Sequence, residues 1–189
     1  MRCLVSLLIG VMNRMEIIEI PNFLTLAECQ EFVQMSENKG YEQAKVNLGS
    51  QQKVMPGIRN NQRYMHLDQP LANMLWDRLK QYAPKTIGNS TAIGLNELFR
   101  FYRYTKDQRF KRHRDGSYIR NETEASYYTF MVYLNDEYEG GSTTFKDREV
   151  KPQTGKGLIF LHDLWHEGTA VTSGKKYVLR SDIMYQINE

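Results

Sequence analysis

The pattern of apolar and polar positions divides the chain into a partly helical first half and a second half made of strands. Thr25 and Glu28 have the spacing of a capping box, and apolar residues at helical intervals predict a helix from there to about Asn38. A second helix is predicted over 70–82, because it begins with a proline and has leucines at helical spacing. One short strand is expected at 16–20, so the first half should be helical with a strand or two.

After Gly94 the helical period disappears. Aromatic and β-branched residues dominate short segments that Gly, Asp, Asn or Pro separate, which is typical of a sandwich or jelly roll. The predicted strands are 95–104, 126–134, 158–161 and 177–185. No linker or repeat interrupts the chain, so we expect one α+β, mainly β domain over 1–189, with helices and first strands in 1–93 and the strand-rich part in 94–189.

The composition limits the kinds of binding site that the chain can form. The 189 residues are 41% hydrophobic and 25% charged, as in a soluble globular domain, and the net charge of +3 alone does not imply nucleic-acid binding. Two cysteines exclude a disulfide scaffold and a four-thiolate zinc site. A histidine metal site must therefore come from the four histidines of the chain, which are His66, His113, His162 and His166.

The N-terminus carries the one membrane-like segment. Residues 3–12 are apolar but too short to span a bilayer. They have the length of a signal-peptide core, yet no small-x-small cleavage site follows them. Residues 1–14 are thus either signal-like or untranslated, and we expect a cytoplasmic protein with no membrane partner.

His113-Arg114-Asp115 is the first feature with chemical meaning. In an extended chain residues i and i+2 share a face, so the imidazole and the carboxylate can bind one ion, with His166 as a third ligand. Two histidines and one carboxylate are the ligand set of non-heme Fe(II) oxygenases. His66-Leu67-Asp68 repeats the motif, but Asp68 stands just before a predicted helix, where it should act as a cap.

The order of residues around His113 carries a family resemblance. The sequence elements concerned are Tyr104, His113-x-Asp115, Tyr133-Leu134-Asn135, Gly140-Gly141-x-Thr143-x-Phe145, Pro152, Gly155-x-Gly157-x-x-Phe160, His166, Val171, Gly174 and Lys176. Over about the last 90 residues the chain resembles the prolyl 4-hydroxylase-like Fe(II)/2-oxoglutarate dioxygenases. The resemblance implies a double-stranded β-helix (jelly roll) over 94–189. It also implies Fe(II) bound by His113, Asp115 and His166, with no catalytic side chain beyond these ligands.

The same resemblance implies the cosubstrates and their site. O2 and 2-oxoglutarate would yield succinate and CO2, with ascorbate as a further reductant. Lys176 is placed to bind the distal carboxylate of 2-oxoglutarate, because a buried carboxylate needs a charged partner. Arg180 shares the face of Lys176 and is a competitor. Tyr133, Thr143 and Tyr104 match positions that line the oxoglutarate pocket.

His162 leaves a zinc alternative open. His162 and His166 are four residues apart, which on a helix would suggest a zinc pair, and with His113 they could serve a hydrolase. The preceding segment is strand-like, so we expect His162 at the surface or beside the metal ligands.

The substrate is the least determined part of the prediction. Residues 100–120 contain eight basic and two acidic residues, a net charge of +6 around the metal motif. Relatives border the substrate cleft with a segment such as 58–63, so Arg59, Asn61 and Arg63 are substrate candidates. We expect hydroxylation of a prolyl residue, another peptide or protein side chain, or a free amino acid. The alternatives are a non-catalytic sensor of the same fold and an oxygenase of small molecules or nucleic acid, although nucleic acid is not an expected partner.

Overall fold

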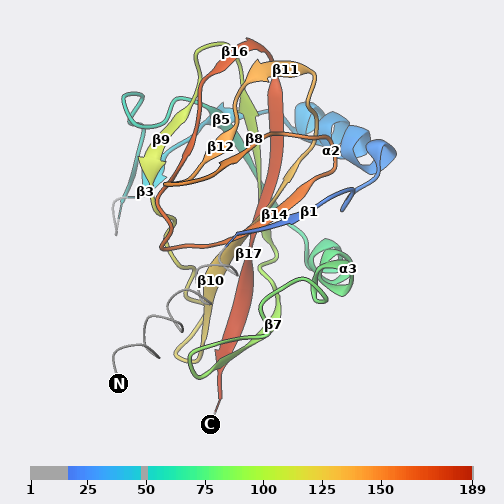
Figure 1. The fold of residues 1–189 in the computed structure, drawn as a ribbon, viewed down its shortest axis with the longest axis vertical. Helices are drawn as coiled ribbons and strands as arrows, with labels where there is room; N and C mark the ends of the chain where they lie inside the picture. Colours follow the sequence, from blue (N-terminus) through green and yellow to red (C-terminus); the bar gives the residue numbers. More distant parts are fainter. Residues whose placement is uncertain (1–16, 48–50, 189) are drawn as a thin grey trace.

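The computed structural model describes residues 17–47 and 51–188, and its elements are two helices and seventeen strands (Figure 1). The helices are α2 (Leu26–Lys39) and α3 (Gln69–Leu79). The strands are β1 (Ile17–Ile20), β2 (Glu42–Gln43), β3 (Val46–Asn47), β4 (Gln52–Lys53), β5 (Gln62–Leu67), β6 (Thr86–Ile87), β7 (Ser90–Leu95), β8 (Leu98–Tyr104), β9 (Phe110–His113), β10 (Glu124–Tyr133), β11 (Tyr138–Gly140), β12 (Thr143–Thr144), β13 (Glu149–Val150), β14 (Gly157–Leu161), β15 (His166–Gly168), β16 (Val171–Gly174) and β17 (Lys176–Ile187).

Both helices begin with the caps that the sequence predicts. The Thr25 hydroxyl accepts from the Glu28 N–H at 3.2 Å, and the Glu28 carboxylate accepts from the Thr25 N–H at 2.8 Å. Asp68 accepts from the Leu71 N–H at 2.9 Å, so the second H-x-D motif serves as a helix cap. The predicted end of α3 at residue 82 was wrong, because the helix ends at Leu79.

The first half contains more strand than the sequence predicted. β5 pairs with β8 along its whole length, from Gln62 opposite Arg103 to Leu67 opposite Leu98. Pairing with a buried strand outweighs the polar character of the segment, which is why its sequence did not reveal a strand. The expectation of one or two strands before residue 94 was wrong.

The strands form one large sheet and a smaller one. The large sheet has the order β1-β14-β10-β17-β8-β5-β2, and β7 also pairs with β17 and β6. The smaller sheet has the order β13-β12-β15-β9, and two two-stranded pairs, β11-β16 and β3-β4, complete the set. In Figure 1 both helices lie on one side of the large sheet, with β9 and β12 on the other. This is the mainly β, jelly-roll arrangement with supporting helices that the sequence predicts.

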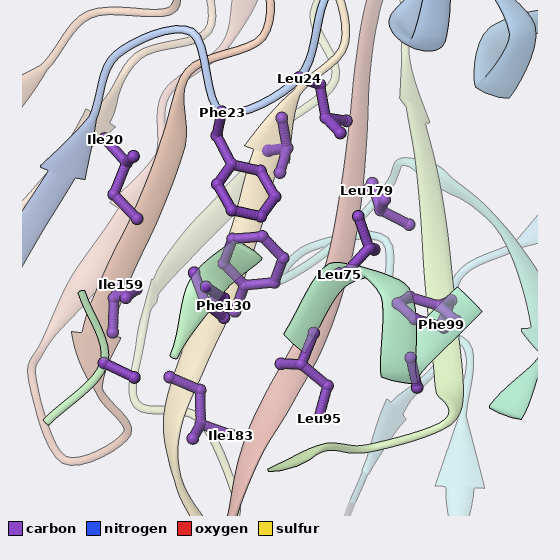
Figure 2. Close-up of a cluster of buried hydrophobic side chains, with 14 of the residues drawn as sticks. Ile20, Phe23, Leu24, Leu75, Leu95, Phe99, Phe130, Ile159, Leu179 and Ile183 are labelled. Carbon is purple, nitrogen blue, oxygen red and sulfur yellow. The ribbon is translucent and has the colours of Figure 1, made fainter. Parts of the chain in front are cut away.

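Alternation along the strands divides the buried residues between two cores. The core under the helices contains Leu75 of α3 together with Phe99, Phe130 and Leu179 of the large sheet, and Figure 2 shows these side chains within one cluster of apolar residues. The second core lies between the sheets. Because neighbouring residues of a strand point to opposite faces, Lys176, Val178, Arg180 and Asp182 of β17 share the face of this second core.

Gly155 joins the N-terminal segment to the sheet. Its φ of +76° suits glycine, and its carbonyl accepts from the Leu24 N–H at 3.1 Å. A Cβ atom at this position would lie 2.1 Å from the Leu24 carbonyl oxygen. No helix in the described part of the chain is long and apolar enough to cross a membrane.

Candidate metal and cosubstrate site

Two strands of the smaller sheet bring the predicted metal ligands together. β9 ends at His113 and β15 begins at His166, and these residues are direct partners in the antiparallel register. Asp115 follows two residues after β9. The Nε2 atoms of His113 and His166 lie 3.5 and 3.7 Å from the two Asp115 carboxylate oxygens. Among the described residues this is the one group of three potential ligands whose donor atoms all lie within 4.8 Å.

The hydrogen bonds of the two imidazoles leave their Nε2 atoms available. Nδ1 of His113 lies 2.8 Å from the Lys111 carbonyl, and Nδ1 of His166 lies 2.9 Å from the Leu164 carbonyl. A carbonyl can only accept, so each Nδ1 carries a hydrogen and each Nε2 faces Asp115. Burial lowers the pKa of His166 to about 4, which keeps this ring neutral. The donor set of two imidazoles and a carboxylate fits Fe(II).

Asp115 is kept ionised by its neighbours. Burial alone would raise its pKa, but Arg180 Nη1 lies 3.0 Å from Oδ1, and together with the two imidazoles it holds the pKa of Asp115 well below its usual range. The Thr129 hydroxyl donates to Oδ2 at 2.6 Å. The carboxylate is therefore an anion in a fixed orientation before any metal binds.

His162 lies behind these ligands and not at the surface. It is 4% exposed, with Nδ1 3.0 Å from the Thr129 hydroxyl and Nε2 3.0 Å from the Ser126 hydroxyl. Its carbonyl accepts from the Asp115 N–H at 3.0 Å. Of the two places expected for His162, the surface was wrong, and the position beside the ligands is the one found. Because both ring nitrogens already have partners, His162 is not placed to join a zinc group with His113 and His166.

Lys176 is a buried cation in the same pocket. It is 3% exposed, and its ammonium donates to the Gly141 carbonyl at 2.5 Å. The ammonium lies 5.2 and 5.4 Å from the ring centres of Tyr104 and Tyr133, and among the described residues no carboxylate forms an ion pair with it. Burial lowers the pKa of Lys176 to about 7. Lys175, by contrast, is exposed, as strand alternation predicts.

The other predicted pocket residues surround this lysine. The Tyr133 hydroxyl donates to the Thr143 hydroxyl at 2.7 Å, and Tyr104 is buried beside them. Arg180 is half-buried, and it already contacts Asp115 and Asp182. Lys176 thus has a free capacity for an anion that Arg180 lacks.

One pocket between the two sheets contains both the three potential metal ligands and Lys176. Its lining comes from the facing strands of both sheets and consists of Tyr102, Tyr104, Phe110, His113, Asp115, Thr129, Met131, Thr143, Phe160, His166, Gly168, Lys176, Val178 and Arg180. A metal and a dicarboxylate could therefore occupy one continuous space.

Of the three predicted substrate residues, Arg59 lies beside this pocket. Arg59, Asn61 and Arg63 are all buried. Arg59 stacks on Tyr102 and Phe110, which line the pocket. Arg63 lines a separate groove with Tyr41 and Tyr64.

Sequence reasoning missed several residues of the site. Tyr102, Phe110 and Thr129 line the pocket, and Asp182 anchors Arg180 and Arg100. Strand alternation could have found two of them, because Tyr102 is two residues from Tyr104 and Asp182 is two residues from Arg180. No comparable signal marked Thr129, whose role depends on contacts with Asp115 and His162 from distant parts of the chain.

Comparisons with known proteins agree with this geometry. Residues 99–181 match the family described as the 2OG-Fe(II) oxygenase superfamily. Among curated proteins none matches the chain. Solved structures share its fold. A viral collagen prolyl hydroxylase from Paramecium bursaria Chlorella virus 1, solved with 2OG, is 19% identical, with coverage of 91% of this chain and 97% of that one and a TM-score of 0.63.

Two further prolyl hydroxylases have the same fold. One from Pseudomonas putida is 19% identical over 89% of this chain and 92% of its own, with a TM-score of 0.63. One from Trichoplax adhaerens, in complex with a hypoxia inducible factor peptide fragment, is 17% identical over 95% and 88%, with a TM-score of 0.71. The segment that matches the family contains His113, Asp115, His166 and Lys176. Residues 99–181 are thus similar to the 2OG-Fe(II) oxygenase superfamily, and the fold of the chain is similar to that of prolyl hydroxylases.

Proposed function

We propose that the protein is an Fe(II)- and 2-oxoglutarate-dependent hydroxylase of a prolyl residue, another peptide or protein side chain, or a free amino acid. The observation that carries this proposal is the presence, in one pocket, of a His-Asp-His group and of a buried lysine that has no acidic partner among the described residues. The first group fits the metal and the second fits the distal carboxylate of the cosubstrate.

The residues of the chain have separate parts in this reaction. Bound Fe(II) would supply the activation of O2, with 2-oxoglutarate oxidised to succinate and CO2 as the substrate C–H bond is hydroxylated. His113 and His166 would hold the metal through Nε2, and Asp115 through its carboxylate. Lys176 would orient 2-oxoglutarate, with Tyr104, Tyr133 and Thr143 around it.

The carboxylate at position 115 favours hydroxylation. Iron halogenases of this broad fold replace it with a small residue to make room for a halide, whereas here Asp115 is buried, ionised and held by Arg180 and Thr129. A non-catalytic scaffold of this fold that bound neither metal nor 2-oxoglutarate would need neither the intact ligand set nor Lys176. We extend the proposal to a cytoplasmic location and to ascorbate as a reductant that maintains Fe(II).

The test begins with protein reconstituted anaerobically with Fe(II). Addition of 2-oxoglutarate and O2 should give succinate, at a slow basal rate without a primary substrate and faster with an accepted peptide or amino acid. His166→Ala should abolish succinate formation, whereas His66→Ala should retain it, because His66 lies beside the α3 cap. Absence of succinate above background in the wild type would contradict the proposal. Binding of 2-oxoglutarate without turnover would favour the sensor.

A further inference from the structure

Arg59 is a buried cation with an unused hydrogen-bond donor. Arg59 is 5% exposed, and its Nε donates to the Asn61 amide oxygen at 2.7 Å. Nη2 is buried and has no hydrogen-bond partner among the described residues. Buried donors almost always have partners, so this guanidinium nitrogen has the capacity to bind a ligand group.

The guanidinium lies one aromatic ring away from the candidate metal site. Its central carbon is 4.5 Å from the ring centre of Tyr102 and 4.3 Å from that of Phe110, and both rings line the pocket. The Phe110 ring stacks on the His113 ring, with centroids 3.4 Å apart. Backbone bonds fix this arrangement, since Arg59 forms a β-bridge with Phe110 and the Lys111 N–H donates to the Ile58 carbonyl at 2.9 Å.

The arginines beside the pocket differ in their acidic partners. Arg100 and Arg180 both contact Asp182, and Arg180 also contacts Asp115. In the described part of the chain Arg59 forms no ion pair with a carboxylate, and its Nε donates to a neutral amide. Burial of a cation is costly unless an anion accompanies it.

The pKa of Tyr102 reflects the positive potential that these arginines create. Burial would raise the pKa of its phenol, yet Arg59, Arg180 and Arg100 lower that pKa to about 8. The same potential that favours a phenolate there favours any other anion beside Arg59.

We propose that Arg59, with Tyr102 beside it, binds a carboxylate of the primary substrate. This inference rests on the proposed function and narrows it. The substrate would be a free amino acid, or a peptide that presents its C-terminal or side-chain carboxylate. A guanidinium offers the paired donors that suit a carboxylate.

The cosubstrate has its own cation, so the two anions would not compete. Lys176 lies over the ring of Tyr104 and Arg59 over the ring of Tyr102, and these tyrosines are successive residues on one face of β8. Lys176 thus lines the pocket as the cation for 2-oxoglutarate, and Arg59 lies behind Tyr102 and Phe110 as the cation for the substrate.

The test compares acids with their neutral amides. Free L-amino acids, beginning with L-proline, are paired with their carboxamides. Short proline-containing peptides are paired as free acids and C-terminal amides, and an amidated peptide with an internal aspartate is paired with its asparagine counterpart. Calorimetry on the anaerobic protein with Fe(II) and 2-oxoglutarate gives the Kd of each compound, and succinate formation under O2 gives its stimulation of turnover.

We expect at least one acid to bind about tenfold or more tightly than its amide, as the loss of a charge-assisted hydrogen bond implies. Arg59→Gln should remove this preference, and Arg59→Lys should restore part of it. Arg109→Gln is the matched control. This arginine is exposed and directly precedes β9, the strand that contains Phe110, the β-bridge partner of Arg59. Which acid responds also separates free amino acids from peptide termini and acidic side chains.

Three results would overturn the inference. They are equal binding of acids and amides, failure of every acid to bind, and a loss of 2-oxoglutarate affinity in Arg59→Gln measured without substrate, which would assign Arg59 to the cosubstrate. Basal succinate formation separates the two proposals: if it occurs while acids and amides behave alike, the hydroxylase assignment stands and the carboxylate site fails.

Discussion

Thr129 donates its hydroxyl hydrogen to Asp115, with Oγ1 2.6 Å from Oδ2. A hydroxyl has a single hydrogen, so Nδ1 of His162, 3.0 Å from the same Oγ1, must be the donor to Thr129. Nε2 of His162 then accepts from Ser126, whose oxygen already accepts from the Tyr118 N–H at 2.8 Å. One chain of hydrogen bonds therefore connects a candidate metal ligand to a buried, neutral histidine.

We predict that His162 carries its hydrogen on Nδ1, and that this chain supports metal binding. Thr129→Val should weaken Fe(II) or Co(II) binding by about 10- to 100-fold, because the Asp115 carboxylate would lose the bond that orients it. Nitrogen-15 NMR of the imidazoles measures the tautomer in the metal-free protein, and calorimetry measures the affinity.

The matched control is Thr172→Val, since Thr172 is an exposed strand threonine. An Nε2–H tautomer of His162, or a Thr129→Val protein with wild-type metal affinity, would contradict the argument.

Lys176 should dominate cosubstrate binding. Lys176→Met should raise the Kd for 2-oxoglutarate by about 10- to 100-fold, the effect of a lost charge-assisted hydrogen bond in a buried site. Lys175→Met, which changes an exposed neighbour, should leave that Kd unchanged. If Lys176→Met bound 2-oxoglutarate normally and Arg180→Met did not, the distal carboxylate would belong to Arg180.

The pKa of Lys176 also predicts how cosubstrate binding depends on pH. Burial lowers this pKa to about 7, and binding requires the ammonium form. The affinity for 2-oxoglutarate should therefore fall as pH rises above about 7, toward a limit of tenfold per pH unit for one proton. The phenols that face Lys176 from β8 and β10 are Tyr104 and Tyr133, and burial raises the pKa of both, so they stay neutral in this range.

Calorimetry at pH 8 in buffers of different ionisation enthalpy should show proton uptake on 2-oxoglutarate binding. Lys176→Arg should bind without that uptake, because a guanidinium stays charged. Equal proton uptake in both proteins would assign the titration to another group.

The sequence predicted the parts of this protein that depend on local order and spacing. The caps at Thr25 and Asp68 need contacts only three residues away, and the main strands have strong β-branched and aromatic character. His113, Asp115 and His166 were found because their order along the chain matches a known pattern. β5 could not be found in this way, since its polar residues become a strand only by pairing with β8. The same holds for Thr129, whose partners Asp115 and His162 lie far away in the sequence.

Gly155 should be irreplaceable for stability. Gly155→Ala would put a side chain on a residue with φ of +76° and bring its Cβ against the Leu24 carbonyl, so we expect a loss of at least about 2 kcal/mol. Urea denaturation measures this as a lower midpoint. Gly57→Ala is the control, because nothing lies within 4 Å of its added Cβ, and its change should stay within about 0.5 kcal/mol.

β17 pairs with β10, β8 and β7 and carries Lys176, Arg180 and Asp182 on one face. Side chains on one face of a strand repeat every second residue, at intervals of about 6.6 Å. The strand therefore fixes the distance between Lys176, the cation for the cosubstrate, and Arg180, the cation beside Asp115. Insertion of one residue between Lys176 and Arg180 would turn one of them away from the pocket. A change in the length of this segment would therefore remove one of the two charges from the pocket.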